Sequence, residues 1–230
     1  MSTNTAPTKD IRTNGIILRR TNYGEADRIL NILTPQGKIT AIARSVRKTR
    51  SKLAGSIEMF SLIDFNIHQG RSEMGVVTGA KMLEYYNQII TDFDRMELMG
   101  VILKRVSRAA EHSDSPDFFN ITKQCLQELN SAANLELTEG WFLLNLMRAS
   151  GEEVNLYRDT AGSKLTIDAR YNWEPASESF TRHEQGEYDS NDIKVLRLMT
   201  TTSLKTTRKI KVPASTYSKL LNLIRAASHI

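Results

Sequence analysis

The sequence predicts an α+β protein in which a small β-barrel is followed by an α-helical domain. Between Ile11 and about Tyr86, short apolar runs alternate with polar residues, which is typical of strands with one buried face. From Asp92 onward, apolar residues recur instead at helical spacing. No helical segment separates the N-terminal strands, so nothing there could cover a parallel sheet. A closed five-stranded Greek-key barrel of the OB type fits best.

Five strands are expected in the barrel. The fourth is the clearest, because apolar and polar residues alternate strictly from Ile63 to His68. A turn, Thr34-Pro35-Gln36-Gly37, follows the second strand. The other four strands are expected at residues 15–18, 28–33, 38–45 and 74–80.

The helical part begins with apolar residues at helical spacing from Leu98 to Ala109. A second helix is expected after Ser115-Pro116, since serine favours the N-cap and proline the first helical position. Thr138 can cap a third helix, which Gly151 can end. Two more helices are expected, at residues 192–199 and 216–227.

Three divisions of the chain follow. Residues 1–10 are rich in Ser, Thr, Asn and Pro and are expected to form a disordered tail. Residues 11–86 form the barrel, and residues 87–230 the helical domain. Within the latter, residues 157–190 lack sustained periodicity and are expected to be irregular, with a small hairpin around residues 164–171.

Composition excludes several classes of protein. No apolar run approaches the roughly 18 residues of a membrane-spanning helix, and no signal peptide is evident at the N-terminus. One cysteine, Cys125, allows neither an internal disulfide nor a zinc site built from cysteines. It lies among leucines of the second predicted helix, where a small core residue is expected rather than a nucleophile.

The most informative segment is strongly basic and connects the third strand to the fourth. It runs from Arg44 to Lys52. Five of these nine residues are cationic and none is acidic: Arg44, Arg47, Lys48, Arg50 and Lys52. Residues 1–80 carry 12 Lys and Arg against 6 Asp and Glu, which leaves −1 for the rest of a chain whose net charge is +5. This asymmetry favours a polyanionic partner, nucleic acid before membrane.

The basic segment has a functional and an ordinary interpretation. Its cations could neutralise phosphates, with an expected salt slope of about −3.5 on single strands if all five take part. They could equally form a solvated loop with common surface charge. Lys38 and Arg20, at strand ends, could extend the same groove or be plain surface charges. Tyr23 could stack on a base or pack, half-buried, over the mouth of the barrel.

A second basic cluster lies ahead of the last helix and comprises Lys205, Arg208, Lys209 and Lys211. It could contact duplex DNA or an acidic protein tail, or serve as a soluble linker. Evidence for catalysis is thin. Glu25 and Asp27 are expected to form a strand-end ion pair with Arg28, the histidines lack ligand spacing, and no phosphate-loop motif exists. No enzyme and no cofactor are expected.

The order of residues resembles the RecO family of DNA-repair proteins. Three ordered segments carry the resemblance: Gly15-Ile16-Ile17-Leu18, then Tyr23-Gly24-Glu25-Ala26-Asp27-Arg28-Ile29-Leu30, and Leu33-Thr34-Pro35-Gln36-Gly37-Lys38-Ile39 followed by Ala41 to Lys48. The resemblance implies an OB-fold DNA-binding domain ahead of a helical domain. It also implies a recombination mediator that binds single- and double-stranded DNA and anneals complementary strands. A cytoplasmic, nucleoid-associated location is expected, since no signal peptide or membrane-spanning run is evident. The implied partners are a RecR-like protein, the tail of single-strand-binding protein and, indirectly, RecA.

One departure from the family is large. Many members carry two Cys-x-x-Cys pairs after the third helix, which form a zinc finger. The corresponding region here, from Asn155 onward, contains no cysteine. We expect an apolar mini-core instead of metal, made by Leu165, Ile167, Tyr171, Trp173 and Phe180. Two alternative functions stay open beside the mediator: an RNA-binding barrel, and a protein–protein adaptor whose basic loop engages an acidic peptide.

Overall fold

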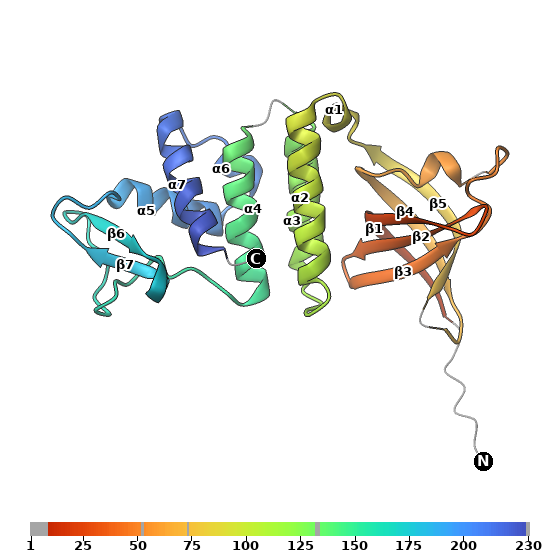
Figure 1. Ribbon diagram of the computed structural model, residues 1–230, viewed down its shortest axis with the longest axis horizontal. Helices are drawn as coiled ribbons and strands as arrows, with labels where there is room; N and C mark the ends of the chain where they lie inside the picture. The colour runs from red at the N-terminus through yellow and green to blue at the C-terminus, as the bar shows by residue number, and fades with distance from the viewer. Residues whose placement is uncertain (1–8, 52, 73, 132–133, 229–230) are drawn as a thin grey trace, which may run out of the picture. The chain divides into compact units, whose positions relative to one another are not determined.

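The computed structural model describes residues 9–51, 53–72, 74–131 and 134–228 (Figure 1). The chain divides into two compact units, Met1–Asn130 and Ser131–Ile230. The first contains the five-stranded sheet and helices α1 to α3, and the second contains helices α4 to α7 with a small hairpin. No helix among the described residues is long and apolar enough to cross a membrane.

The first unit is built on a closed barrel, which confirms the predicted α+β class. Its strands follow the order β1-β2-β3-β5-β4, and all neighbours are antiparallel except β3 and β5. This is the strand order of an OB-type barrel. The strands are β1 (Lys9–Tyr23), β2 (Asp27–Thr34), β3 (Gly37–Ala43), β4 (Ser61–Gln69) and β5 (Gly75–Tyr85).

Strand β1 is far longer than the predicted residues 15–18, because it pairs with two neighbours in turn. Its first half pairs with β4 and its second half with β2, and an irregularity between Ile17 and Arg19 bends it from one to the other. Lys9 and Asp10 begin this strand opposite Gln69 and His68, so placing them in a disordered tail was wrong. The rest of the predicted tail lies outside the described residues.

Two other strand ends also differ from expectation. Strand β3 ends at Ala43 and not at Ser45, whose φ of 53° is in the left-handed region and cannot continue a strand. Strand β5 continues past Ala80 to Tyr85, because β4 supplies pairing partners along that length.

The barrel interior is filled by the apolar faces of the strands. Ile17, Ile32 and Phe65 are fully buried there. Gly15 is required by this packing, since a Cβ atom would lie 2.4 Å from Cγ2 of Ile32 and 2.9 Å from Cδ2 of Phe65.

Three helices complete the first unit: α1 (Asn87–Ile90), α2 (Phe93–Ala109) and α3 (Asp117–Leu129). Asp92 caps α2 by accepting from the backbone N–H of Arg95 at 3.1 Å. The predicted cap of α3 was wrong by one residue, because Pro116 itself occupies the N-cap and Ser115 lies outside the helix. Cys125 is buried in α3, and this burial raises the pKa of its thiol.

The second unit contains α4 (Leu135–Ser150), α5 (Ser190–Thr201), α6 (Leu204–Thr207) and α7 (Ala214–Ala227). Asn134 caps α4, accepting from the N–H of Leu137 at 3.0 Å. Thr138 is therefore not the cap; it lies one turn inside, where its hydroxyl donates to the Asn134 carbonyl at 2.8 Å. Gly151 does end the helix, with φ of 85°, as predicted.

A hairpin, β6 (Tyr171–Glu174) and β7 (Ser179–Arg182), lies between α4 and α5 in the chain. A short 3₁₀ helix, η2 (Pro175–Ser177), connects its strands. The hairpin predicted around residues 164–171 was therefore misplaced. Its turn is made by residues 175–178, where Pro175 opens η2 and Glu178 is left-handed with φ of 47°.

Four aromatic rings form the interior beside this hairpin. Phe180 is central, with ring centroids 6.2 Å from Tyr171, 5.3 Å from Trp173 and 5.9 Å from Tyr188, all edge-on. Ile167 was expected in this mini-core but is 69% exposed. Burial, together with nearby carboxylates, raises the pKa of Tyr188 to about 12.

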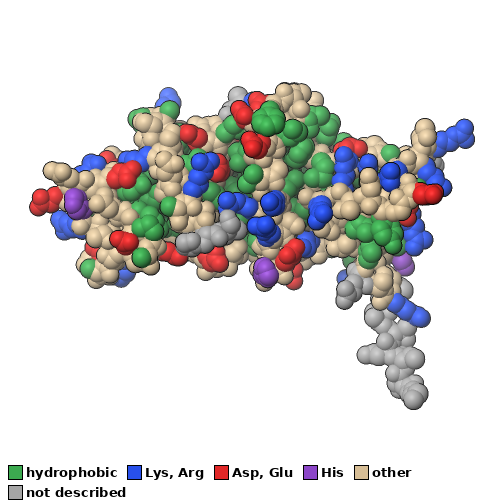
Figure 2. All heavy atoms as spheres, in the orientation of Figure 1, with side chains coloured by type: hydrophobic (Ala, Val, Ile, Leu, Met, Phe, Trp, Pro, Cys, Tyr) green, Lys and Arg blue, Asp and Glu red, His purple; other side chains and the backbone are tan. Residues whose placement is uncertain are grey.

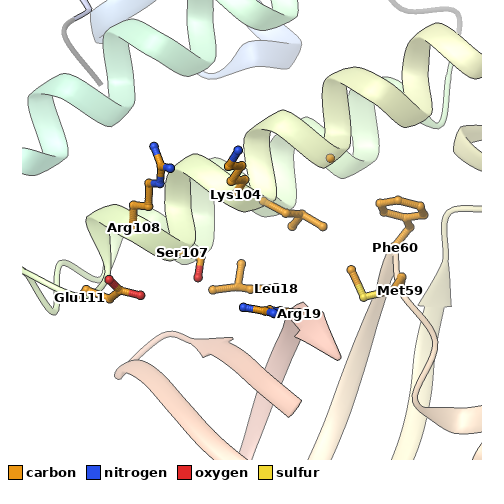
Figure 3. A pocket seen from close by; sticks show the side chains of 10 residues that line it. Leu18, Arg19, Met59, Phe60, Lys104, Ser107, Arg108 and Glu111 are labelled. Carbon is orange, nitrogen blue, oxygen red and sulfur yellow. The ribbon is translucent and has the colours of Figure 1, made fainter. Parts of the chain in front are cut away.

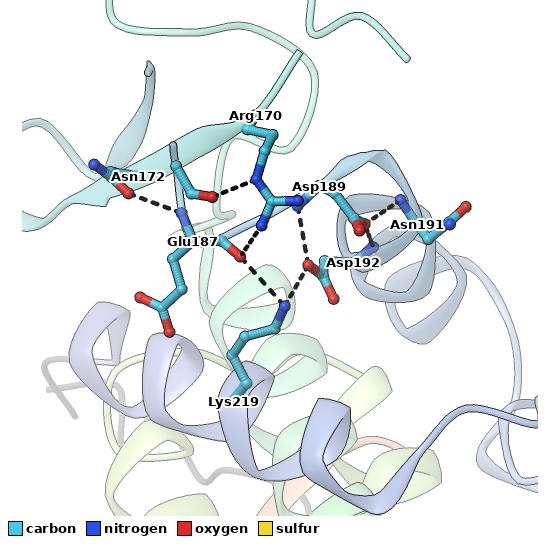
Figure 4. Close-up of polar contacts among 8 residues, drawn as sticks. Arg170, Asn172, Glu187, Asp189, Asn191, Asp192 and Lys219 are labelled. Atoms are coloured by element: carbon cyan, nitrogen blue, oxygen red, sulfur yellow. Dashed lines mark hydrogen bonds and ion pairs between the residues drawn. The ribbon is translucent and has the colours of Figure 1, made fainter. Parts of the chain in front are cut away.

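A polar network joins the hairpin region to α5 and α7 (Figure 4). Arg170 donates to the carbonyl of Gly186 at 2.6 Å, and Lys219 of α7 donates to the buried carboxylate of Asp192 at 2.5 Å. Asp189 caps α5 and forms a capping box with Asp192. The irregular segment is thus tied to the helices by charges and backbone hydrogen bonds.

Candidate nucleic-acid interface

The basic loop, residues 44–56, leaves β3 and returns to β4 through the 3₁₀ helix η1 (Ala54–Ser56). It is fixed to the barrel at both ends. Val46 is only 2% exposed and Ile57 is fully buried, and both side chains belong to the barrel core. A single apolar residue within the charged run therefore turns the segment into an anchored loop rather than a free tail.

Hydrogen bonds tie the same loop to the turn between β1 and β2. The N–H of Arg47 donates to the carbonyl of Ala26 at 2.9 Å, and its guanidinium donates to the carbonyl of Gly24 at 3.2 Å. The N–H of Ser45 donates to the carboxylate of Asp27 at 2.7 Å. The backbone at Ser45 and Arg47 is thereby held against the turn between β1 and β2.

Asp27 thus has a role that the sequence did not reveal. It was expected in an ion pair with Arg28, but its carboxylate accepts from Ser45, and Arg28 donates to Asn22 at 3.3 Å instead. Glu25 lies in the exposed turn between the strands and not on a strand. These two carboxylates show no arrangement for acid–base chemistry.

Four of the five cations of the predicted basic segment are brought together by this loop. Arg44, Arg47, Lys48 and Arg50 all have exposed side chains. Lys and Arg side chains are prominent over the barrel in Figure 2. Across the part of the chain that the structure describes, no ion pair joins these four side chains to an acidic residue. The fifth, Lys52, lies outside the described residues.

Lys38 and Arg20, by contrast, are paired within the first unit. Lys38 donates to Glu111 at 3.2 Å and to the carbonyl of Ser107 at 3.4 Å, so it faces α2. Arg20 donates to Glu58 at 2.7 Å. A cation that already has a carboxylate partner must give it up to bind phosphate, so both are weaker candidates than the loop cations.

Tyr23 ends β1 beside the turn to which the loop is tied, and its side chain is 55% exposed. More than half of the residue is therefore accessible, and its role in stacking stays a prediction. An exposed ring next to Gly24, whose carbonyl accepts from Arg47, is available to stack on a base.

The second basic cluster belongs to the second unit. Lys205 lies in α6, and Arg208, Lys209 and Lys211 follow it; all four are exposed. Arg208 donates to the hydroxyl of Ser131 at 3.2 Å. The cluster is therefore accessible, and one of its members helps to hold the start of the second unit.

Comparison with known proteins identifies the family. The N-terminal model of recombination protein O matches residues 9–86, and its C-terminal model matches residues 90–228. The chain belongs to the RecO family. The DNA repair protein RecO of Dehalococcoides mccartyi is 30% identical over 226 residues, covering 94% of this chain and 88% of that protein. The RecO of Roseiflexus sp. is 29% identical over 223 residues, covering 94% and 78% respectively.

The segment after α4 is where the resemblance led us to consider a zinc finger. Zinc sites in proteins use Cys, His and carboxylate ligands in a group of about four. The described residues contain no group of three or more such side chains placed to hold an ion. His183 instead accepts from the backbone N–H of Gln185 at 3.2 Å, and the aromatic rings around Phe180 occupy the interior.

Proposed function

We propose that this RecO family protein is a non-enzymatic recombination mediator whose barrel holds DNA through the basic loop. The observation that carries the proposal is an anchored loop with four exposed cations and no acidic partner among the described residues. Flexible cations that neutralise phosphates release condensed counterions, which supplies affinity without regard to sequence. Such contacts suit both single- and double-stranded DNA.

Strand annealing follows from the same charge. A cationic surface lowers the repulsion between two phosphate backbones and leaves the base edges free to pair. The loop contributes this charge on exposed side chains, and hydrogen bonds at Ser45 and Arg47 already hold part of its backbone, so less backbone entropy is lost on binding. Annealing therefore needs no catalytic group, and we assign none.

The proposal extends to partners that RecO family membership implies. With a RecR-like partner, the protein helps RecA to replace single-strand-binding protein on DNA. The acidic tail of single-strand-binding protein is the partner proposed for Lys205, Arg208, Lys209 and Lys211, which are exposed and cationic. These residues could add a second DNA contact.

The deciding experiment is annealing of complementary strands, bare or coated with single-strand-binding protein, with and without a RecR-like partner. We expect the protein alone to accelerate annealing of bare strands, and the partner to be required for RecA loading on coated strands. No acceleration by a protein that demonstrably binds DNA would remove the annealing role. Absence of DNA binding at moderate salt would remove the mediator role as well.

A further inference from the structure

A pocket of about 560 Å³ lies within the first unit, between the barrel and α2 (Figure 3). Leu18 and Arg19 line it from β1, and Met59 and Phe60 lie at one end. Helix α2 contributes the opposite wall, including Leu103, Lys104, Ser107 and Arg108. The pocket thus combines an apolar interior with several cations.

The charges around this pocket are unbalanced. Glu111 is its acidic lining residue, and that carboxylate is already paired with Lys38 at 3.2 Å. Within the described ranges, no hydrogen bond or ion pair engages the side chains of Arg19, Lys104 and Arg108. Three unpartnered cations beside an apolar cavity call for a ligand with an apolar body and negative charge.

Strand β1 connects this pocket to the basic loop. Arg19, Thr21 and Tyr23 pair regularly with β2 and alternate along the strand, so all three point to the same, exposed face. The four residue steps from Arg19 to Tyr23 span about 13 Å, the length of about four stacking steps of a nucleic-acid strand. Tyr23 lies next to Gly24, which accepts from Arg47 of the loop. The exposed face thus leads from the pocket to the phosphate-binding cations.

We propose that the pocket receives an unpaired base of single-stranded DNA, with the flanking phosphates against Arg19, Lys104 and Arg108. Phe60 is half-buried at one end of the pocket, so a base can stack on its ring. Its backbone is left-handed, with φ of 57°, which sets the direction in which the side chain leaves the chain. This inference rests on the proposed DNA binding and adds strand discrimination to it, because a base paired in a duplex cannot enter.

Gly100 offers a way to fill the pocket without disturbing the fold. It lines the pocket from the exposed side of α2, and a Cβ atom there would meet nothing within 4 Å. Gly100→Leu places an apolar side chain in this space, and Gly100→Ala is the matched control that adds one methyl group. Both replace glycine within a helix, so both should fold at least as well as the parent chain.

The test compares DNA affinities of the full-length parent, Gly100→Leu and Gly100→Ala. The probes are a fluorescent single-stranded oligonucleotide, its abasic counterpart with the same phosphates, and a duplex. For the parent we expect the abasic strand to bind about tenfold more weakly than the normal strand. Gly100→Leu should abolish that difference and leave duplex affinity unchanged, while Gly100→Ala should retain it.

Cross-linking locates the contact independently. Single strands carrying 5-iodouracil should cross-link to Phe60 or Met59 in the parent and in Gly100→Ala, and not in Gly100→Leu. Equal binding of normal and abasic strands by the parent, with DNA affinity intact, would overturn the base pocket and leave the proposed function standing. If the parent binds normal and abasic strands equally and an acidic peptide with an apolar end binds in the pocket, the pocket is a protein-binding site instead. Absence of any DNA binding by the parent protein would overturn both this proposal and the proposed function.

Discussion

At the scale of single residues, the basic loop separates anchoring from binding. Val46 and Ile57 hold it to the barrel core, while the side chains of Arg44, Lys48 and Arg50 are exposed to solvent. Each exposed cation contributes little to folding, because surface charges interact weakly in water. Their number and spacing can therefore be suited to DNA binding without affecting the stability of the barrel.

The first prediction concerns these loop cations. Replacing Arg47, Lys48 and Arg50 with Gln should weaken single-strand binding on the order of tenfold to a hundredfold at 0.1 M salt. It should also reduce the magnitude of the salt slope by about 2. Fluorescence anisotropy measures the affinity. A thermal melt should show a nearly unchanged Tm, because all three side chains are exposed and the bond lost from Arg47 to the Gly24 carbonyl is itself exposed to solvent.

The matched control removes the same charge elsewhere. Lys164, Arg182 and Lys194 are exposed residues of the second unit, outside both basic clusters. Their replacement by Gln should leave DNA affinity nearly unchanged. If both triple variants lose affinity equally, net charge and not the loop governs binding.

The sequence indicated the loop cations but not the contacts that place them. A dense run of Arg and Lys is visible without a structure. Asp27 and Ser45 are 18 positions apart, and nothing in the local pattern shows that the carboxylate of one accepts from the N–H of the other. The apolar Val46 within the charged run was a signal that could have been used, since such a residue has reason to be buried.

At the scale of elements, the capping carboxylate of α5 gives a pH-dependent prediction. Asp189 accepts from the N–H groups of Asp192 and Asn191, and these bonds hold its pKa below the ordinary range. A depressed pKa contributes stability above the unfolded-state value, and this is lost as pH falls through the folded-state value. Stability from this group should therefore decline below about pH 4.

Asp189→Ala should lower the free energy of unfolding by about 1 kcal/mol at pH 7, and the difference should shrink toward pH 3. Urea denaturation at both pH values measures it. Asp168→Ala is the control, because Asp168 is an exposed loop carboxylate. A deficit that stays constant with pH would mean that the cap acts without its charge.

The hairpin of the second unit supplies a prediction about metal. Phe180→Ala should destabilise this unit by about 3–5 kcal/mol, because the ring is fully buried among three other aromatic rings. Ile167→Ala, at a 69% exposed position, should change stability by less than about 0.5 kcal/mol. EDTA should leave the Tm of the parent unchanged; a lower Tm would reveal a structural ion.

Secondary structure could be predicted where it depends on the local sequence. The prediction failed where residues distant in the sequence determine how long a strand is or which residues share a core. The alternating strand β4 and the glycine end of α4 were predicted correctly. The full length of β1 was not, since its first residues pair with β4 more than fifty positions later. Likewise, Tyr188 packs in the aromatic core although it follows the hairpin in the sequence. Its sequence neighbours are polar, so the local pattern did not indicate that it is buried.

At the scale of the whole molecule, the charge asymmetry predicts how DNA binding depends on salt. If five loop cations neutralise phosphates, raising salt from 50 to 200 mM should reduce single-strand affinity about a hundredfold. Each additional cation from the cluster at residues 205–211 should steepen the log–log slope by about 0.7. A titration of affinity against salt measures the total number of contacts. A slope near zero would contradict electrostatic binding altogether.

The two anchors of the basic loop also bear on how this family can diversify. Because Val46 and Ile57 fix both ends in the barrel, the segment between them is a closed excursion whose length changes cost little free energy. Insertions there would alter reach and charge while the strand register stays constant. The same scaffold could then be adapted to a different polyanion, or made neutral, by changing a stretch of about ten residues.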